Sequence, residues 1–118
     1  MSVIRIVADL AADEPRVHAR FYQDLLGLEV AMDQGFIVTV QSASQMQPQL
    51  SFMNQGGSNA PVPALSIEVD NLDNVYAKAR QLKAEIVYPL TEEPWNVRRF
   101  FLRDPAGRLI NILEHRDI

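Results

Sequence analysis

The chain has 118 residues, of which 47% are apolar and 22% charged, and it contains no cysteine. This length and composition predict one globular domain over residues 1–118 and exclude disulfides, thiolate metal sites and cysteine nucleophiles. A net charge of -4 argues against nucleic acid or a membrane as a partner, because both require a basic surface. No apolar stretch approaches the ~20 residues that cross a bilayer, and no signal-peptide pattern is visible. We therefore expect a soluble, cytoplasmic protein.

The first half of the chain reads as a strand, a helix and two or three further strands. Residues 2–8 are rich in β-branched side chains, which predicts a strand. Asp13 or Glu14 can cap a helix that has Pro15 in its first turn and stops at Gly27. Strands are expected at 28–32, 36–40 and 50–53, before a probable linker at 56–61. Apolar residues recur along one helix face, which we expect to pack on the core: Val17, Phe21 and Leu25, with Leu26 beside them.

The second half repeats this order at an offset of about sixty residues. Residues 64–69 predict a strand, and Asp70 or Asn71 can cap the helix that follows. A strand at 85–88 and a loop at 89–94 lead to two apolar runs between Arg98 and His115, separated by Asp104–Gly107. The proline and glycine in that tetrapeptide favour a turn, so the chain is expected to end in a long β-hairpin. One face of the second helix carries Leu72, Val75, Ala79 and Leu82.

Three segments of the chain carry a resemblance to a known superfamily: Phe21–Leu28, Ile67–Asp73 and Asp104–Gly107. In this order and spacing they resemble the vicinal oxygen chelate superfamily, which includes glyoxalases, extradiol dioxygenases and bleomycin-resistance proteins. The resemblance implies an α+β fold of two βαβββ modules, about residues 1–57 and 62–118, that form a curled mixed sheet, or cup, with the helices outside. It also implies a homodimer, in which related proteins sometimes exchange an N-terminal strand.

Enzymes of that superfamily usually hold a divalent metal with His and Glu side chains from four cup-lining strands. The internal repeat places the four equivalent positions near Val3, Ser51, Ala64 and Asn111, with Arg5 as a rival to Val3. Divalent transition metals favour imidazole and carboxylate ligands, and none of these five side chains supplies one. We therefore expect no metal and no other cofactor.

The remaining acidic and imidazole groups do not form a recognisable catalytic set. His18 and His115 are expected at surface or capping positions, and Glu68 is a single carboxylate without imidazole partners. Glu92 and Glu93 are adjacent in the expected loop and are read as solvated rather than as an acid–base pair. No Gly-x-Ser-x-Gly elbow and no phosphate-binding glycine loop is present. The sequence therefore predicts no catalytic residue.

Without a metal, the cup would be a pocket for a small organic molecule. Trp95, the only tryptophan, is expected in a loop within residues 91–98 and would either stack on a flat or cationic ligand or plug the end of the barrel or the dimer seam. Arg98 would need an anion if it pointed into the cup, either Glu68 or a ligand carboxylate. The other ligand-binding candidates are Ser51, Asn111, Ser66, Phe36 and Glu68.

These residues lead to one hypothesis and two alternatives. The hypothesis is a metal-free protein, resembling bleomycin-resistance proteins, that captures a small organic molecule in a dimer crevice without breaking a bond. The acidic net charge is compatible with a cationic ligand such as an antibiotic. The alternatives are a glyoxalase-type lyase or isomerase with an atypical site, and an interaction module whose cup is packed shut.

Overall fold

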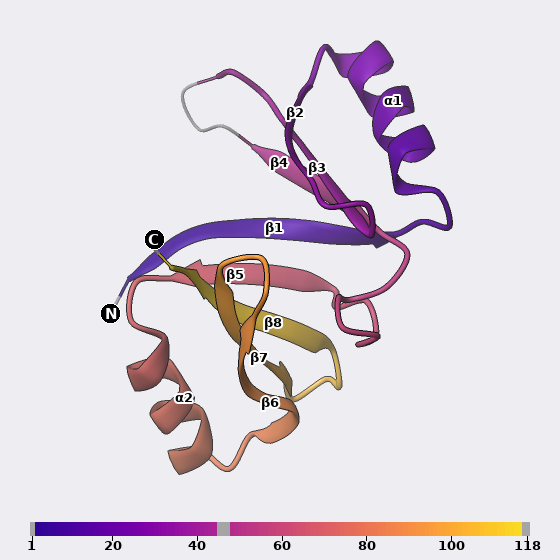
Figure 1. Ribbon diagram of the computed structural model, residues 1–118. Coiled ribbons are helices and arrows are strands. Elements are labelled where there is room, and N and C mark those ends of the chain that lie inside the picture. Colours follow the sequence, from indigo (N-terminus) through magenta and orange to yellow (C-terminus); the bar gives the residue numbers. More distant parts are fainter. Residues whose placement is uncertain (1, 45–47, 117–118) are drawn as a thin grey trace. The chain divides into compact units, whose positions relative to one another are not determined.

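The computed structural model describes residues 2–44 and 48–116, which form eight strands and two helices. They divide into two compact units. The N-terminal unit contains residues 7–44 and 48–62, and the C-terminal unit contains residues 2–6 and 63–116. The first strand, β1 (Val3–Ala11), is longer than expected and contributes residues 3–6 to one unit and 7–11 to the other (Figure 1).

The N-terminal unit is a small mixed sheet with one helix. Its strands run in the order β2-β3-β4-β1, where β2 is Glu29–Asp33, β3 is Ile37–Gln41 and β4 is Gln49–Met53. β4 pairs in parallel with β1 and antiparallel with β3. Helix α1 (Pro15–Leu26) packs on β3 and β4 and ends at Gly27, whose φ of 68° is the left-handed conformation that glycine adopts at no steric cost.

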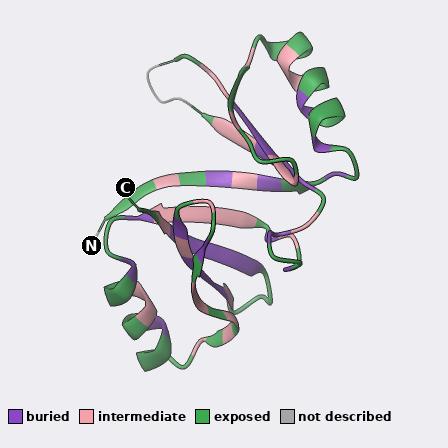
Figure 2. Cartoon of the chain, viewed as in Figure 1, coloured by how far each residue is buried: buried purple, intermediate pink, exposed green. Residues whose placement is uncertain are grey.

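Helix α1 turns its apolar stripe away from the core of its unit. The stripe residues Val17, Phe21 and Leu25 are 61%, 60% and 63% exposed. The buried side is formed instead by Ala19, which lets the helix approach the sheet closely, and by Tyr22, whose ring lies 5.0 Å from that of Phe52. The expectation that the stripe faces the core is therefore wrong, and Figure 2 shows α1 as largely exposed.

The C-terminal unit has the same plan. From the start of β1 its strands follow in the order β5 (Leu65–Val69), β8 (Leu109–His115), β7 (Val97–Arg103) and β6 (Glu85–Glu93). β8 pairs in parallel with β5 and antiparallel with β7. Helix α2 (Leu72–Gln81) is capped as expected by Asn71, whose side chain accepts a hydrogen bond from the Asn74 backbone N–H at 3.2 Å. The core beneath α2 contains Val69, Leu72, Ala79, Phe100, Ile110 and Ile112.

Two segments of this unit differ from expectation. Strand β6 continues through the expected loop at 89–94 as far as Glu93, with register irregularities on both sides of Tyr88. Pro89 is compatible with a strand here because β6 is an edge strand, where a missing N–H leaves no ladder bond unmade. Leu82 lies just beyond α2 and is 73% exposed rather than part of the core.

The closing hairpin forms as the local sequence dictates. The Asp104 carboxylate accepts hydrogen bonds from the backbone N–H groups of Ala106 and Arg108, and Gly107 takes a φ of 85°.

The α+β class and the two βαβββ modules are confirmed. Neither helix in the part of the chain that the structure describes is long and apolar enough to cross a membrane.

Candidate functional site

The sheet of the C-terminal unit has two distinct faces. One packs on α2 and is apolar. The other, called here the helix-free face, alternates with it along each strand because successive side chains point to opposite sides. The helix-free face carries Ser66, Glu68, Arg99, Phe101, Asn111, Leu113 and His115.

A buried amide and a hydroxyl meet at the centre of the helix-free face. Ser66 and Asn111 are register partners on the parallel strands β5 and β8, and the Asn111 Nδ2 donates to the Ser66 Oγ at 3.0 Å. Asn111 is only 6% exposed, yet within the described residues its Oδ1 accepts no hydrogen bond. A buried acceptor without a donor costs about 1–3 kcal/mol, so this atom is suited to receive an N–H or O–H group from a bound molecule.

An ionic row occupies one end of the same face. The Glu68 carboxylate lies 2.9 Å from the Arg5 Nε and 2.9 Å from the His115 Nδ1. The Glu68 side chain is 15% exposed, whereas those of Arg5 and His115 are 33% and 45% exposed. His115 thus lies at the surface end of β8, as expected, with its ring oriented by a carboxylate from β5.

A buried ion pair surrounded by aromatic rings lies on the β6–β7 side of the same face, across β8 from Glu68. The Arg99 Nε donates to the Glu93 Oε2 at 2.6 Å, and both side chains are 3% exposed. The Tyr88 hydroxyl donates to the same oxygen at 2.8 Å. The Arg99 guanidinium also lies 5.1 Å from the Trp95 ring centroid and 4.8 Å from that of Phe101, within the range of cation–π attraction. The Arg99 guanidinium therefore stacks on one face of the Trp95 ring, and that face is not available to a ligand.

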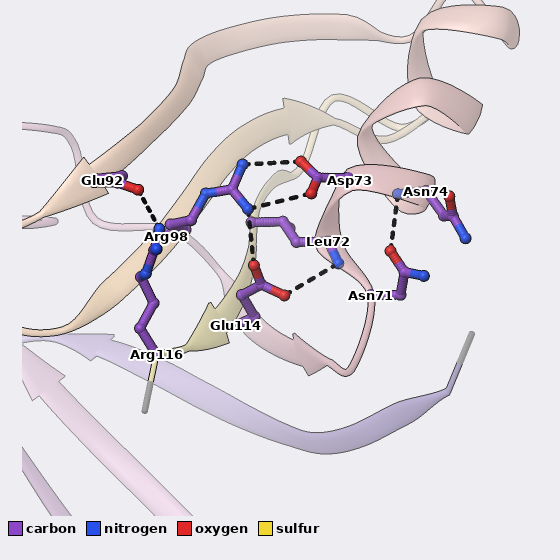
Figure 3. Close-up of polar contacts among 8 residues, drawn as sticks. All are labelled: Asn71, Leu72, Asp73, Asn74, Glu92, Arg98, Glu114 and Arg116. Carbon is purple, nitrogen blue, oxygen red and sulfur yellow. Dashed lines mark hydrogen bonds and ion pairs between the residues drawn. The ribbon is translucent and has the colours of Figure 1, made fainter. Parts of the chain in front are cut away.

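Arg98 lies on the α2 side of the sheet and pairs with neither Glu68 nor the helix-free face. Its guanidinium donates to Asp73 at the start of α2 and to Glu114 on β8, at 2.8 and 2.9 Å (Figure 3). Glu114 in turn accepts from the Leu72 backbone N–H at 3.4 Å, so this cluster fixes the first turn of α2 to the sheet. Arg98 therefore does not pair with Glu68, one of the two anions that a cup-facing Arg98 would need, and Arg99 is the residue that shares a face with Phe101 and Asn111.

The Arg98–Asp73 pair predicts an acid-sensitive contribution to stability. Hydrogen bonding from the Arg98 guanidinium holds the pKa of Asp73 below its usual value of 3.8. Because the folded-state pKa lies below the unfolded one, the contribution is present above about pH 4 and is lost as the pH falls through the lowered pKa. We expect Asp73→Asn to lower Tm at pH 7 and to converge with the wild type near pH 2. A Tm series from pH 2 to 7 checks this, with Glu29→Gln as a charge-matched control; parallel curves for Asp73→Asn would contradict it.

The donor set does not fit the metal that the superfamily resemblance implies. In residues 2–44 and 48–116 no three His, Cys, Asp or Glu side chains are grouped so that they could hold a metal ion. Asn111 supplies a neutral amide, Ala64 lies just before β5, and Val3 is 58% exposed. Arg5, the rival to Val3, places a guanidinium on Glu68, where a cation would have to compete with it.

The other sequence candidates lie elsewhere. Ser51 and Phe36 belong to the N-terminal unit, where Ser51 is buried and shares a 2.7 Å hydrogen bond with Thr39. Glu92 and Glu93 diverge: Glu92 is exposed and pairs with Arg116, whereas Glu93 is buried against Arg99, so the expectation that both are solvated is wrong for Glu93. Arg99 was missed; its position beside Phe101 in an apolar strand was the available signal.

Comparisons with known proteins identify the same architecture. The family model of the glyoxalase-like domain matches residues 3–116. A comparison with curated proteins finds no match.

Solved structures match over nearly the whole chain. One, described as an NAD-dependent benzaldehyde dehydrogenase from Legionella pneumophila, is 16% identical with a TM-score of 0.76, covering 95% of this chain and 100% of that one. A glyoxalase/bleomycin resistance protein/dioxygenase superfamily member from Vibrio splendidus 12B01 is 18% identical with a TM-score of 0.66, covering 96% and 99%. A methylmalonyl-CoA epimerase variant from Streptomyces coelicolor is 15% identical with a TM-score of 0.74, covering 99% and 98%. At these identities the structures show a shared fold, and with the family match they establish that the chain belongs to the glyoxalase-like family of the vicinal oxygen chelate superfamily.

Proposed function

We propose that this protein binds a small organic molecule on the helix-free face of its C-terminal unit, without a metal and without breaking a bond. The mode of action is stoichiometric capture in the cytoplasm, as in the bleomycin-resistance proteins of the same superfamily. The bound molecule offers an N–H or O–H donor to Asn111, and the net charge of -4 favours a cationic molecule.

The observation that carries this proposal is the Asn111 Oδ1. It is a buried acceptor without a donor in the described residues, held in place by the bond from its own Nδ2 to Ser66. A packed and functionless face would favour an apolar side chain at this position, because a buried polar group that makes only part of its hydrogen bonds destabilises the fold. The position instead keeps an amide whose free atom suits a ligand.

Replacement of Asn111 by leucine separates binding from stability. We expect Asn111→Leu to fold with an unchanged or higher Tm, because it removes the unpaired acceptor, and to lose the stabilisation that ligands give the wild type. A ligand at a hundred times its Kd adds about 2.7 kcal/mol to the wild type. The measurement is a thermal-shift titration against aromatic and cationic small molecules, with Trp95 fluorescence as a second readout, since Trp95 is the only tryptophan.

The control is Ile110→Leu, which alters the same strand on the α2 side and should leave binding intact. Equal ligand stabilisation of Asn111→Leu and the wild type would refute the proposed site. The same titration includes Zn, Ni, Mn, Co and Fe(II). Stabilisation by micromolar metal would instead support the alternative of a glyoxalase-type lyase or isomerase, for which the His115–Glu68 pair would be the oriented base. No response to any compound would favour the interaction module.

The same proposal includes a homodimer, and helix α1 is the surface that supports it. The exposed Val17, Phe21 and Leu25 lie on one face of the helix, opposite the buried Ala19. Beside this stripe, Arg20 and Asp24 make no ion pair among the described residues. Antiparallel pairing of two α1 helices about a two-fold axis at Phe21 would bring each Arg20 close to Asp24 of the second copy. This charge complementarity favours a second copy of the chain as the occupant of the stripe.

A further inference from the structure

A groove on the α2 side of the C-terminal unit is separate from the helix-free face. It has a volume of about 690 Å³ and lies between the C-terminal end of α2 and the turn that joins β7 to β8. Its apolar lining includes Val75, Ala79, Leu82 and Leu102. A volume of this size is within the range of about 300–1,000 Å³ typical of small-molecule sites.

The rim of the groove carries unbalanced positive charge. Three cationic side chains, Lys78, Lys83 and Arg103, line it together with two carboxylates, Glu85 and Asp104. Both carboxylates are paired with arginines: Glu85 lies 3.6 Å from Arg103, and Asp104 lies 3.1 Å from Arg108. Among the described residues neither lysine contacts a carboxylate. In a chain of net charge -4, this leaves two lysines at the mouth of an apolar groove.

One of these lysines occupies a backbone position that normally belongs to glycine. Lys83, the second residue after α2, has a φ of 57°; its N–H donates to the Arg80 carbonyl and the next N–H, of Ala84, donates to the Ala79 carbonyl. At the end of α1 the left-handed conformation is taken by Gly27, with a φ of 68°. A side chain in this conformation is strained, so the fold places the Lys83 ammonium group at the groove at a cost in backbone energy.

From these three observations we propose that the groove binds an amphipathic anion, a molecule with an apolar body and a single carboxylate or phosphate head. The apolar body lies against Leu82 and Leu102, and the head group pairs with Lys78 and Lys83. This site is independent of the Asn111 site and of whatever binds there.

The test is a titration of the full-length protein with decanoate, decyl phosphate and decanol, followed by amide NMR. We expect saturating shifts at Lys83, Ala84 and Gly107, with at least tenfold weaker binding of decanol, and the comparison of the two anions identifies the preferred head group. Lys83→Gly should weaken decanoate binding about threefold and Lys78→Gln/Lys83→Gly about tenfold, as expected for exposed charge pairs. Neither variant should change decanol binding.

A second readout distinguishes a binding role for Lys83 from a purely structural one. Relief of the strained backbone should raise the Tm of Lys83→Gly by about 3–6 °C while binding weakens. Arg16→Gln, which removes one exposed positive charge outside the groove, should leave decanoate binding unchanged. Equal affinity for decanoate and decanol, an equal loss in Arg16→Gln, or a lower Tm for Lys83→Gly would overturn the proposal. Shifts that follow protein concentration instead of decanoate would also overturn it and assign the groove to a protein contact.

Discussion

Arg99→Met is expected to destabilise the protein by about 3–5 kcal/mol, because it leaves the Glu93 carboxylate buried without its cation. Both side chains of the pair are 3% exposed, so water cannot replace the lost guanidinium without local opening. The Tyr88 hydroxyl would remain as a donor to Glu93, but a neutral donor compensates a buried charge only in part. Urea unfolding at pH 7 and 25 °C measures the loss.

A double variant and a neighbouring variant make this prediction specific. In Arg99→Met/Glu93→Gln the buried charge is gone and the amide can still accept from Tyr88, so we expect at least half of the lost stability to return. Arg98→Met, one residue away, should cost less, about 1–2 kcal/mol, since its partners Asp73 and Glu114 are 69% and 22% exposed rather than fully buried. Equal losses for the two arginine variants, or no recovery in the double variant, would show that the buried charge is not the cause.

Phe21→Glu is expected to weaken the proposed α1-mediated dimer at least 100-fold, or about 2.7 kcal/mol. The substitution removes the apolar side chain at the two-fold axis and places two like charges opposite each other. Because Phe21 is 60% exposed within one chain, and its ring contacts only that of Tyr22 among the ring contacts described, the monomer itself should lose about 1 kcal/mol. Sedimentation equilibrium over a range of concentrations gives the dimer Kd.

Charge exchange on the same helix provides the matched control. Arg20→Asp should weaken the dimer because Asp24 of the second copy would then face another carboxylate. Adding Asp24→Arg restores complementary charges and should restore most of the affinity. A wild-type chain that stays monomeric at high concentration, or a Phe21→Glu dimer of normal affinity, would exclude pairing through α1.

The sequence predicted those parts of the fold that depend on neighbouring residues. The closing turn follows from Asp104 and Gly107, the start of α2 from Asn71, and the end of α1 from Gly27, and each acts through backbone groups within a few positions. These signals, repeated in two halves, were sufficient to identify the α+β class and the superfamily.

Which face of a helix or strand is buried depends on residues far away in the sequence, and the sequence predicted these faces less well. Strand alternation separates Arg98 from Arg99 but does not say which one meets a helix; that is decided by Asp73 on α2 and by Glu93 on β6. In α1 the side that packs on the sheet is formed by Ala19 and Tyr22 and not by the more apolar stripe. Hydrophobicity alone does not indicate how closely a helix face can approach a sheet. The burial of Glu93 could not be predicted for a related reason, since Pro89 and Pro94 make residues 89–94 typical of a loop, whereas β6 continues to Glu93.

The division of β1 between the two units bears on the order in which the chain can fold. Residues 3–6 are made before residues 7–62, yet they belong to the unit whose other residues begin at position 63. The Ser2 backbone N–H, for example, donates to the Asp70 carboxylate, across 68 positions. Residues 3–6 therefore wait for β5 before they can pair, whereas residues 8–11 of the same strand can pair with β4 earlier. The backbone N–H and C=O groups of residues 3–6 stay unpaired during that interval, when a nascent chain is most open to chaperones or to mispairing with another copy.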